Sequence, residues 1–461
     1  MPKRRYKSLK NENNLLTGSV WKSLLRFALP FLAATFLQFL YGAVDLYVVG
    51  KFTDAAGVSA VATGSQIMQT VTGLLLGLTT GGTVLIGQYV GAKRPQDVSR
   101  TIGTMFSLFS ILAVVLTAVM LLCADGMIAA MRVPEAAVLP AKQYLFTCGC
   151  GLIFIAGYNT VSGMLRGLGD SRSPMIFIAI ACGINIVGDF ILVGGFGMGA
   201  WGAAIATVAA QGISFLLSVL VLRRSSFPFD FQPSSFRMEK EKVGGLLRMG
   251  SPLAVQNVLV NLSFLLITAI VNNIGLTQSA AAGIVERLTG FSMLAPMAFS
   301  SAISAMSAQN VGANQIDRAK RVMWTGMGFS LLFGTVMFAL AQLFPEGAVG
   351  LMIDDPAVMA QGALYIRSYS FDCILVCLVF CFNGFFAGCG RTGFTMANCL
   401  LVTFLVRVPV VFFMSLLPGV TLFQIGLAAP LASALQIILQ LVYLKVGAWR
   451  KGAPALSHEH I

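Results

Sequence analysis

Apolar stretches of 20 or more residues recur along the whole of this chain of 461 residues. At a rise of about 1.5 Å per residue, a helix of that length crosses a hydrocarbon core of roughly 30 Å. Only 11% of the residues are charged, against roughly 25% in soluble globular domains, so a soluble fold of this size could not bury so much apolar surface. We therefore expect an all-α integral membrane protein with twelve transmembrane helices. The expected spans lie near residues 24–49, 59–84, 98–122, 140–165, 173–194, 200–222, 246–272, 278–303, 319–343, 361–388, 393–416 and 422–446.

The basic residues alternate between the two sides of these spans. The loops of one side hold little beyond Lys51, Arg132 and Lys142. The segments of the other side collect Lys3, Arg4, Arg5, Lys7, Lys93, Arg94, Arg100, Arg172, Arg223, Arg224, Lys240, Lys242, Arg318, Lys320, Arg321, Arg391, Arg450 and Lys451. Because basic residues favour cytoplasmic loops, we expect a multi-pass protein of the cell membrane with both termini in the cytoplasm. The net charge of +13 then reflects membrane orientation, and no nucleic-acid partner is expected.

The same text occurs twice at an offset of 221 to 222 residues. LLRFALP at 24–30 returns as LLRMGSP at 246–252, and the glycines after the fourth span also match. The repeat is six helices long, so both copies have the same orientation and two lobes related by an axis along the membrane normal are expected. The expected domains are an amino-terminal lobe at 1–222, a cytoplasmic linker at 223–245 and a carboxyl-terminal lobe with a basic tail at 246–461. No Walker A pattern or CxxC spacing occurs, so we expect no cofactor or metal site, and an ion gradient as any energy source.

Six ionisable residues lie inside apolar spans, where each costs roughly 2.5 to 3.5 kcal/mol on insertion scales and needs a partner or a function. They are Asp45, Asp189, Glu286, Arg287, Asp372 and Arg407. Gln38, Tyr41 and Asp45 share one helical stripe because they are spaced i, i+3 and i+7. Asn185 lies one turn before Asp189, so this amide and carboxylate face the same way. A polar lining is one interpretation of these residues, and interfacial location or hydrogen bonding between helices is the other.

The second half of the chain carries two of these acids and both arginines. Glu286 and Arg287 are adjacent, so they point about 100° apart on a helix and are not expected to pair. Asp372 begins the apolar part of the tenth span, and Arg407 interrupts the eleventh. An ion-paired structural network and a binding role both stay open for this group. Glu286 falls where the first repeat has Ser65, so it is either a carboxylate for a cationic ligand or the partner of a basic residue such as Arg407.

The sequence resembles the multidrug and toxic compound extrusion family, and the likeness covers nearly the whole chain. The matching text is LPFLAATFLQFLYGAVDLYVVG in the first helix, GQYVGAKRPQDVSR after the second, SGMLRGLGDSRSPM after the fourth, and NIVGDFILVGGFGMGAWGAAIATVAAQ across the fifth and sixth. The chain looks most like the proton-coupled branch of bacteria and archaea. The resemblance implies a coupling-ion site at Asp45, Asn185, Asp189 and Thr207, with sodium as a possible occupant, and a cavity lined by Gln38. The sodium-coupled branch has an acid in the seventh helix, which this chain lacks.

These features predict a secondary active antiporter, not an enzyme, that exports small organic cations or amphiphilic drugs in exchange for protons or sodium ions. The alternative is a lipid-linked precursor flippase of the same wider superfamily. Four intramembrane acids against two arginines favour cationic cargo. We expect a monomer in a lipid bilayer. The expected substrate cavity includes Gln38, Tyr41, Asn159, Glu286 and Asp372, and Arg287 and Arg407 are expected to be structural or to line that cavity.

Overall fold

The computed structural model describes residues 15–224, 228–229, 232–447 and 449, which form helices and no strand. In chain order the helices are α1 (Val20–Phe52), α2 (Ala55–Gly91), α3 (Pro95–Ala130), α4 (Glu135–Cys150), α5 (Leu152–Leu168), α6 (Arg172–Asp189), η1 (Phe190–Gly195), α7 (Gly199–Arg224), η2 (Pro233–Ser235), α8 (Lys240–Asn272), α9 (Leu276–Gly312), α10 (Ile316–Leu343), α11 (Pro345–Gly350), α12 (Pro356–Gly388), α13 (Thr392–Val402), η3 (Thr403–Arg407), α14 (Val408–Ser415), α15 (Leu422–Gly426) and α16 (Ala428–Val446). Of the short elements, η1 and η3 are π-helical and η2 is a 3₁₀ helix.

Eleven helices or helix runs in the described chain are long and apolar enough to cross a membrane, and the bent pair α4 and α5 makes a twelfth. The expectation of an all-α membrane protein with twelve spans is confirmed. The broken span bends by 48° at Gly151, where a Cβ atom would overlap the side chain of Val208 on α7. The position 221 residues later is Asp372, which lies inside the uninterrupted helix α12. The fourth span is therefore bent in the first repeat and continuous in the second.

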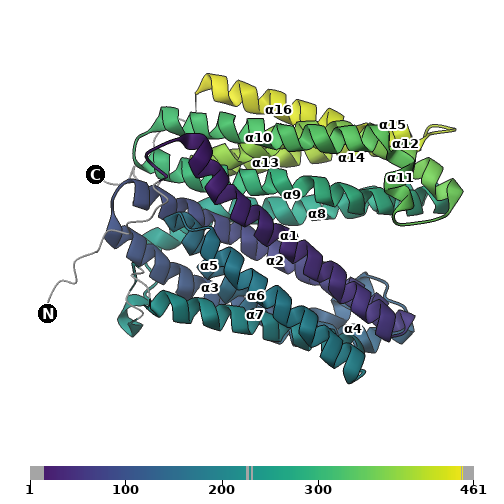
Figure 1. The fold of residues 1–461 in the computed structure, drawn as a ribbon, viewed down its shortest axis with the longest axis horizontal. Helices are drawn as coiled ribbons and strands as arrows, with labels where there is room; N and C mark the ends of the chain where they lie inside the picture. Colours follow the sequence, from purple (N-terminus) through teal and green to yellow (C-terminus); the bar gives the residue numbers. More distant parts are fainter. Residues whose placement is uncertain (1–14, 225–227, 230–231, 448, 450–461) are drawn as a thin grey trace. The chain divides into compact units, whose positions relative to one another are not determined.

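The chain divides into two compact units. The amino-terminal unit holds residues 29–254 with Leu15, and the carboxyl-terminal unit holds residues 16–28 with the described part of 255–461. The division falls inside α1 and inside α8, which are the first helices of the two repeats. Figure 1 shows the helices of both units in the colours of the sequence. The domain boundaries that the repeat alone suggests stay a prediction.

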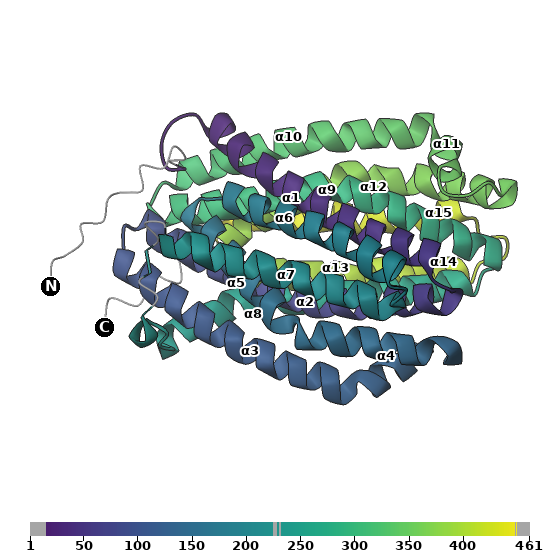
Figure 2. The ribbon, with the colours of Figure 1, turned by 60° about the horizontal axis from the view of Figure 1, so that its bottom comes forward.

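Each unit repeats one close helix contact, which explains two of the matched glycines. In the amino-terminal unit, Gly163 of α5 lies so close to α2 that a Cβ atom would overlap Thr79, and Thr83 donates a hydrogen bond of 2.9 Å to the Gly163 carbonyl. In the carboxyl-terminal unit, Gly384 of α12 makes the equivalent approach to Ser300 of α9. Small residues permit such backbone contact between membrane helices. The views also show α6 beside α7 within the first unit, and α12 packs along α9 within the second (Figure 2).

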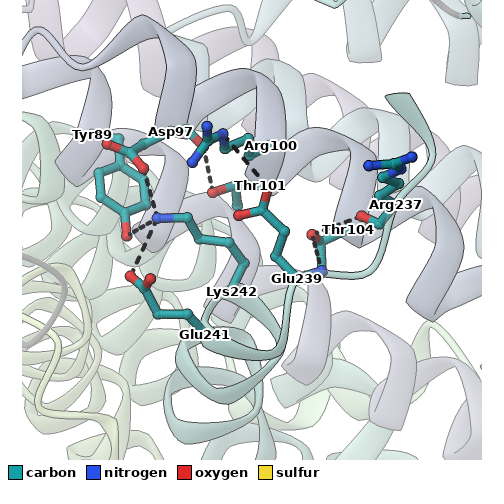
Figure 3. A network of polar contacts seen from close by, with 9 residues as sticks. All are labelled: Tyr89, Asp97, Arg100, Thr101, Thr104, Arg237, Glu239, Glu241 and Lys242. Atoms are coloured by element: carbon teal, nitrogen blue, oxygen red, sulfur yellow. Dashed lines mark hydrogen bonds and ion pairs between the residues drawn. The ribbon is translucent and has the colours of Figure 1, made fainter. Parts of the chain in front are cut away.

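The start of α8 is anchored to α3 within the amino-terminal unit (Figure 3). Lys242 Nζ lies 2.7 Å from Asp97 Oδ1 and donates a hydrogen bond of 2.9 Å to the Tyr89 hydroxyl. The Lys242 side chain is only 4% exposed. One helical turn further along α3, the Arg100 guanidinium lies 3.5 Å from Glu239. Within this unit the start of α8 is thus tied to α2 and α3 by the buried Lys242, and a more exposed ion pair lies beside it.

Candidate ion and cargo sites

Two buried carboxylates of the amino-terminal unit lie together. Asp45 comes from α1 and is 5% exposed, and Asp189, the last residue of α6, is fully buried. The Thr207 hydroxyl on α7 donates to Asp45 Oδ2 at 3.5 Å, and the Asn185 amide on α6 donates to the Thr207 oxygen at 3.3 Å. Asp189 also interacts with Asp45 electrostatically. The structure therefore brings the four expected coupling-site residues together from three helices.

This group has more hydrogen-bond acceptors than donors. Apart from the neighbouring carboxyl group, neither oxygen of Asp189 has a hydrogen-bond partner among the described residues. Asp45 Oδ1 and the Asn185 side-chain oxygen are likewise unpartnered within that part of the chain. A buried polar group without a partner costs about 1 to 3 kcal/mol, and more when it is charged. A bound proton or cation would give these oxygens a partner, since both interact favourably with carboxylate oxygens.

The backbone is irregular where Asp189 is placed. Helix α6 ends at Asp189 and continues directly as the π-helix η1. The wider π turn shifts the register of the following side chains, and such turns occur often at functional sites. The local sequence, VGDFILVGG, carried no signal that distinguished a π turn from an ordinary membrane helix.

A small pocket opens beside the carboxylates. Its lining residues are Tyr41, Ala181, Cys182, Asn185, Thr207, Ala210 and Gln211. Even its whole empty volume, about 180 Å³, is below the range of about 300 to 1,000 Å³ typical of pockets for drug-sized ligands. In this conformation the pocket therefore suits an ion or water better than a drug. Gln211 was missed by sequence reasoning, although it lies one turn after Thr207 and so shares its helix face.

Two other residues expected in the cavity do not line this pocket. Gln38 is exposed on α1. Asn159 is buried on α5, where its amide donates a hydrogen bond of 2.8 Å to the carbonyl of Ile155. Of the cavity residues expected in this unit, only Tyr41 therefore lines the pocket.

A second charged group lies in the carboxyl-terminal unit around Arg407. Arg407 ends the π-helix η3, its guanidinium carbon lies 4.5 Å from the centre of the Phe264 ring, and it donates to the Tyr369 hydroxyl at 3.4 Å. Glu286 and Asp372 interact with it electrostatically. Within the described residues, however, no carboxylate oxygen lies within 4.0 Å of an Arg407 nitrogen. Direct pairing of Glu286 with Arg407 is therefore absent from this conformation.

The repeat clarifies the position of Glu286. Its counterpart Ser65 forms a hydrogen bond of 3.1 Å with the Tyr144 hydroxyl. Tyr365, which lies 221 residues after Tyr144, interacts with Glu286 in the carboxyl-terminal unit. The second repeat thus has a carboxylate where the first has a hydroxyl. The adjacent Arg287, which points in a different direction around the helix, is exposed on α9, and its expected structural or cavity role stays a prediction.

The fold and the buried charges define a membrane transporter, and the comparisons with known proteins agree. The family profile described as MatE matches residues 30–191 and again residues 252–413, one copy in each repeat. The chain therefore belongs to the MatE family of multidrug efflux transporters. Its members are driven by ion gradients and are not enzymes.

Several of the similar proteins are named for multidrug resistance. The chain is 29% identical over 355 residues to the probable multidrug resistance protein YoeA of Bacillus subtilis, and the aligned residues cover 76% of each chain. It is 27% identical over 453 residues to the probable multidrug resistance protein NorM of Thermotoga maritima, with 95% of each chain covered. A solved outward-facing multidrug resistance MATE family transporter has a TM-score of 0.90 at 19% identity and covers 96% of this chain and 100% of its own. These relatives do not favour the flippase alternative.

Proposed function

We propose that this transporter is an antiporter that exports organic cations or amphiphiles while protons enter through Asp45, Asn185, Asp189 and Thr207. The observation that carries the proposal is the set of unpartnered oxygens on two neighbouring buried carboxylates. Two unpaired carboxylates are costly to bury, and loading of a proton lowers that cost because it neutralises one carboxylate and gives it a donor for the other. Loading and release would then favour different states of the protein, as antiport requires.

Cargo is proposed to bind apart from the ion. The pocket beside Asp45 is small, whereas the carboxyl-terminal unit has Glu286 and Asp372 beside one arginine. Two acids against one base attract a cation. Ion and cargo that favour different states affect each other's affinity reciprocally even when their sites are separate.

The experiment is transport by the purified protein in liposomes under one imposed gradient at a time. A fluorescent organic cation such as ethidium is the cargo, and either a pH gradient or a sodium gradient is the only driving force. We expect transport driven by the pH gradient. Transport driven by sodium alone would keep antiport and replace the ion, while no response to either gradient would reject the proposal.

The proposed setting is the cell membrane, with the transporter acting as a monomer and both termini in the cytoplasm. The alternation of basic loop residues supports this orientation. The terminal basic residues that contribute to it, among them Lys3 and Lys451, lie outside the described residues. Modification of cysteines introduced singly into loops, by a reagent that does not cross membranes, tests the orientation.

A further inference from the structure

Arg407 binds an aromatic face instead of the acids around it. Its guanidinium lies over the Phe264 ring of α8 and donates to the Tyr369 hydroxyl of α12. An arginine stacked on an aromatic ring gains cation–π attraction, which is larger in a site without water. In the same neighbourhood Asp372 is 5% exposed, interacts with Ser433, and has an oxygen, Oδ1, without a hydrogen-bond partner among the described residues.

The charges of this group do not cancel. Glu286 and Asp372 carry two negative charges when ionised, and Arg407 carries one positive charge. Asp372 is buried, Glu286 and Arg407 are half-buried, and Arg287 is exposed, so Arg287 does not neutralise this group. The two acids are thus stabilised by a cation that attracts them from a distance and forms no contact pair with either of them.

We propose that Arg407 is a tethered counter-cation that competes with cationic cargo for Glu286 and Asp372, and so sets how tightly the transporter holds its cargo. This inference rests on the cargo role of the two acids in the proposed function. An exporter must release its cargo as well as bind it. A guanidinium on the Phe264 ring leaves the acids open to cargo, and movement of that guanidinium toward the acids would expel the cargo by like-charge repulsion and by replacing it as their partner.

A purely structural role for Arg407 predicts something else. If the guanidinium only balances buried charge, its removal lowers stability and leaves cargo affinity unchanged or weaker. Under the proposed competition, its removal strengthens cation binding. The two roles therefore predict opposite signs for the same measurement.

The experiment measures binding of tetraphenylphosphonium to the purified full-length protein in detergent by equilibrium dialysis. We expect Arg407→Gln to bind this cation about tenfold more tightly, since removal of a neighbouring like charge in a medium of intermediate dielectric has an effect of that order. Arg321→Gln, which removes an exposed arginine from α10 of the same unit, is the control and should leave the affinity unchanged. The gain should disappear in Glu286→Gln/Arg407→Gln, and the neutral analogue triphenylphosphine oxide should show no gain.

Phe264→Leu tests the same idea with every charge retained. Loss of the ring frees the guanidinium to approach the acids, so tetraphenylphosphonium should bind about three- to tenfold more weakly. Unchanged or weaker binding by a folded Arg407→Gln variant, or unchanged or tighter binding by Phe264→Leu, would overturn the proposal. If Glu286→Gln alone leaves wild-type binding intact, the cargo role itself fails. If Glu286→Gln weakens binding while Arg407→Gln does not strengthen it, only the competition fails.

Discussion

Removing Asp97 from its ion pair with Lys242 should lower the stability of the protein more than removing Lys242 does. The ammonium group of Lys242 is almost fully buried, while Asp97 is 24% exposed. Asp97→Asn leaves a buried ammonium group whose remaining partners are the Tyr89 hydroxyl and Glu241, which lies 3.5 Å away and is mostly exposed. Removing one partner of a buried pair costs about 3 to 5 kcal/mol. Lys242→Met leaves instead a carboxylate that water can reach, so we expect a smaller loss of about 1 to 2 kcal/mol.

The pair should also be coupled. Once Asp97 is neutral, most of the stability loss comes from the unpaired buried ammonium group. The double variant Asp97→Asn/Lys242→Met removes that group as well, so it should lose less stability than the two single variants lose when added together. We expect a coupling energy of about 1 to 3 kcal/mol, as for contacting residues in general. The measurement is unfolding in mixed micelles titrated with a denaturing detergent.

An exposed pair of the same unit provides the control. Lys142 and Asp125 lie 2.6 Å apart, but their side chains are 49% and 74% exposed. Exposed pairs contribute about 0 to 1 kcal/mol, so Asp125→Asn should change stability little although the distance is similar. The reasoning is refuted if Asp97→Asn costs no more than Asp125→Asn, because burial would then not decide the value of the pair.

Three further changes test other parts of the account. Asn185→Ala should reduce gradient-driven transport less than Asp45→Asn does, because the amide helps to orient the site without carrying charge; equal losses in transport assays would indicate a rigid structural network. Gly151→Val should destabilise the protein by about 1 to 3 kcal/mol through overpacking against Val208, and a thermal midpoint equal to that of the wild type would contradict this packing argument. Thr207→Val should raise the apparent proton affinity of transport in a pH titration, since it removes the hydroxyl that donates to the Asp45 carboxylate and stabilises its charged form, and an unchanged pH profile would exclude that role.

Much of the architecture could be predicted because membrane insertion depends on local composition. Runs of apolar residues indicate the spans, and the repeat of LLRFALP as LLRMGSP indicates two similar halves. The convergence of Asp45, Asn185, Asp189 and Thr207 was expected only from the family resemblance, because spacing along one chain does not determine which helices meet. The structure brings these four residues together, and their role in coupling stays a prediction.

Other features depend on tertiary contacts that the sequence does not reveal. The break lies at Gly151, where a Cβ atom would overlap Val208, which lies 57 residues further along the chain. The π turns at Asp189 and Arg407 have no distinguishing composition. The suggested ion pair between Glu286 and Arg407 is not formed in this conformation, in which the guanidinium lies over the Phe264 ring instead.

Transport by the Asp45→Asn variant tests the central claim most directly. The asparagine keeps the shape of the carboxylate and cannot cycle a proton. In liposomes under an imposed pH gradient we expect this variant to lose gradient-driven ethidium transport, while its binding of tetraphenylphosphonium in detergent stays within about threefold of the wild type. Asp125→Asn, which changes an exposed acid of the same unit, should transport normally. Wild-type transport by Asp45→Asn under the same gradient would contradict the account and remove this carboxylate from the coupling mechanism.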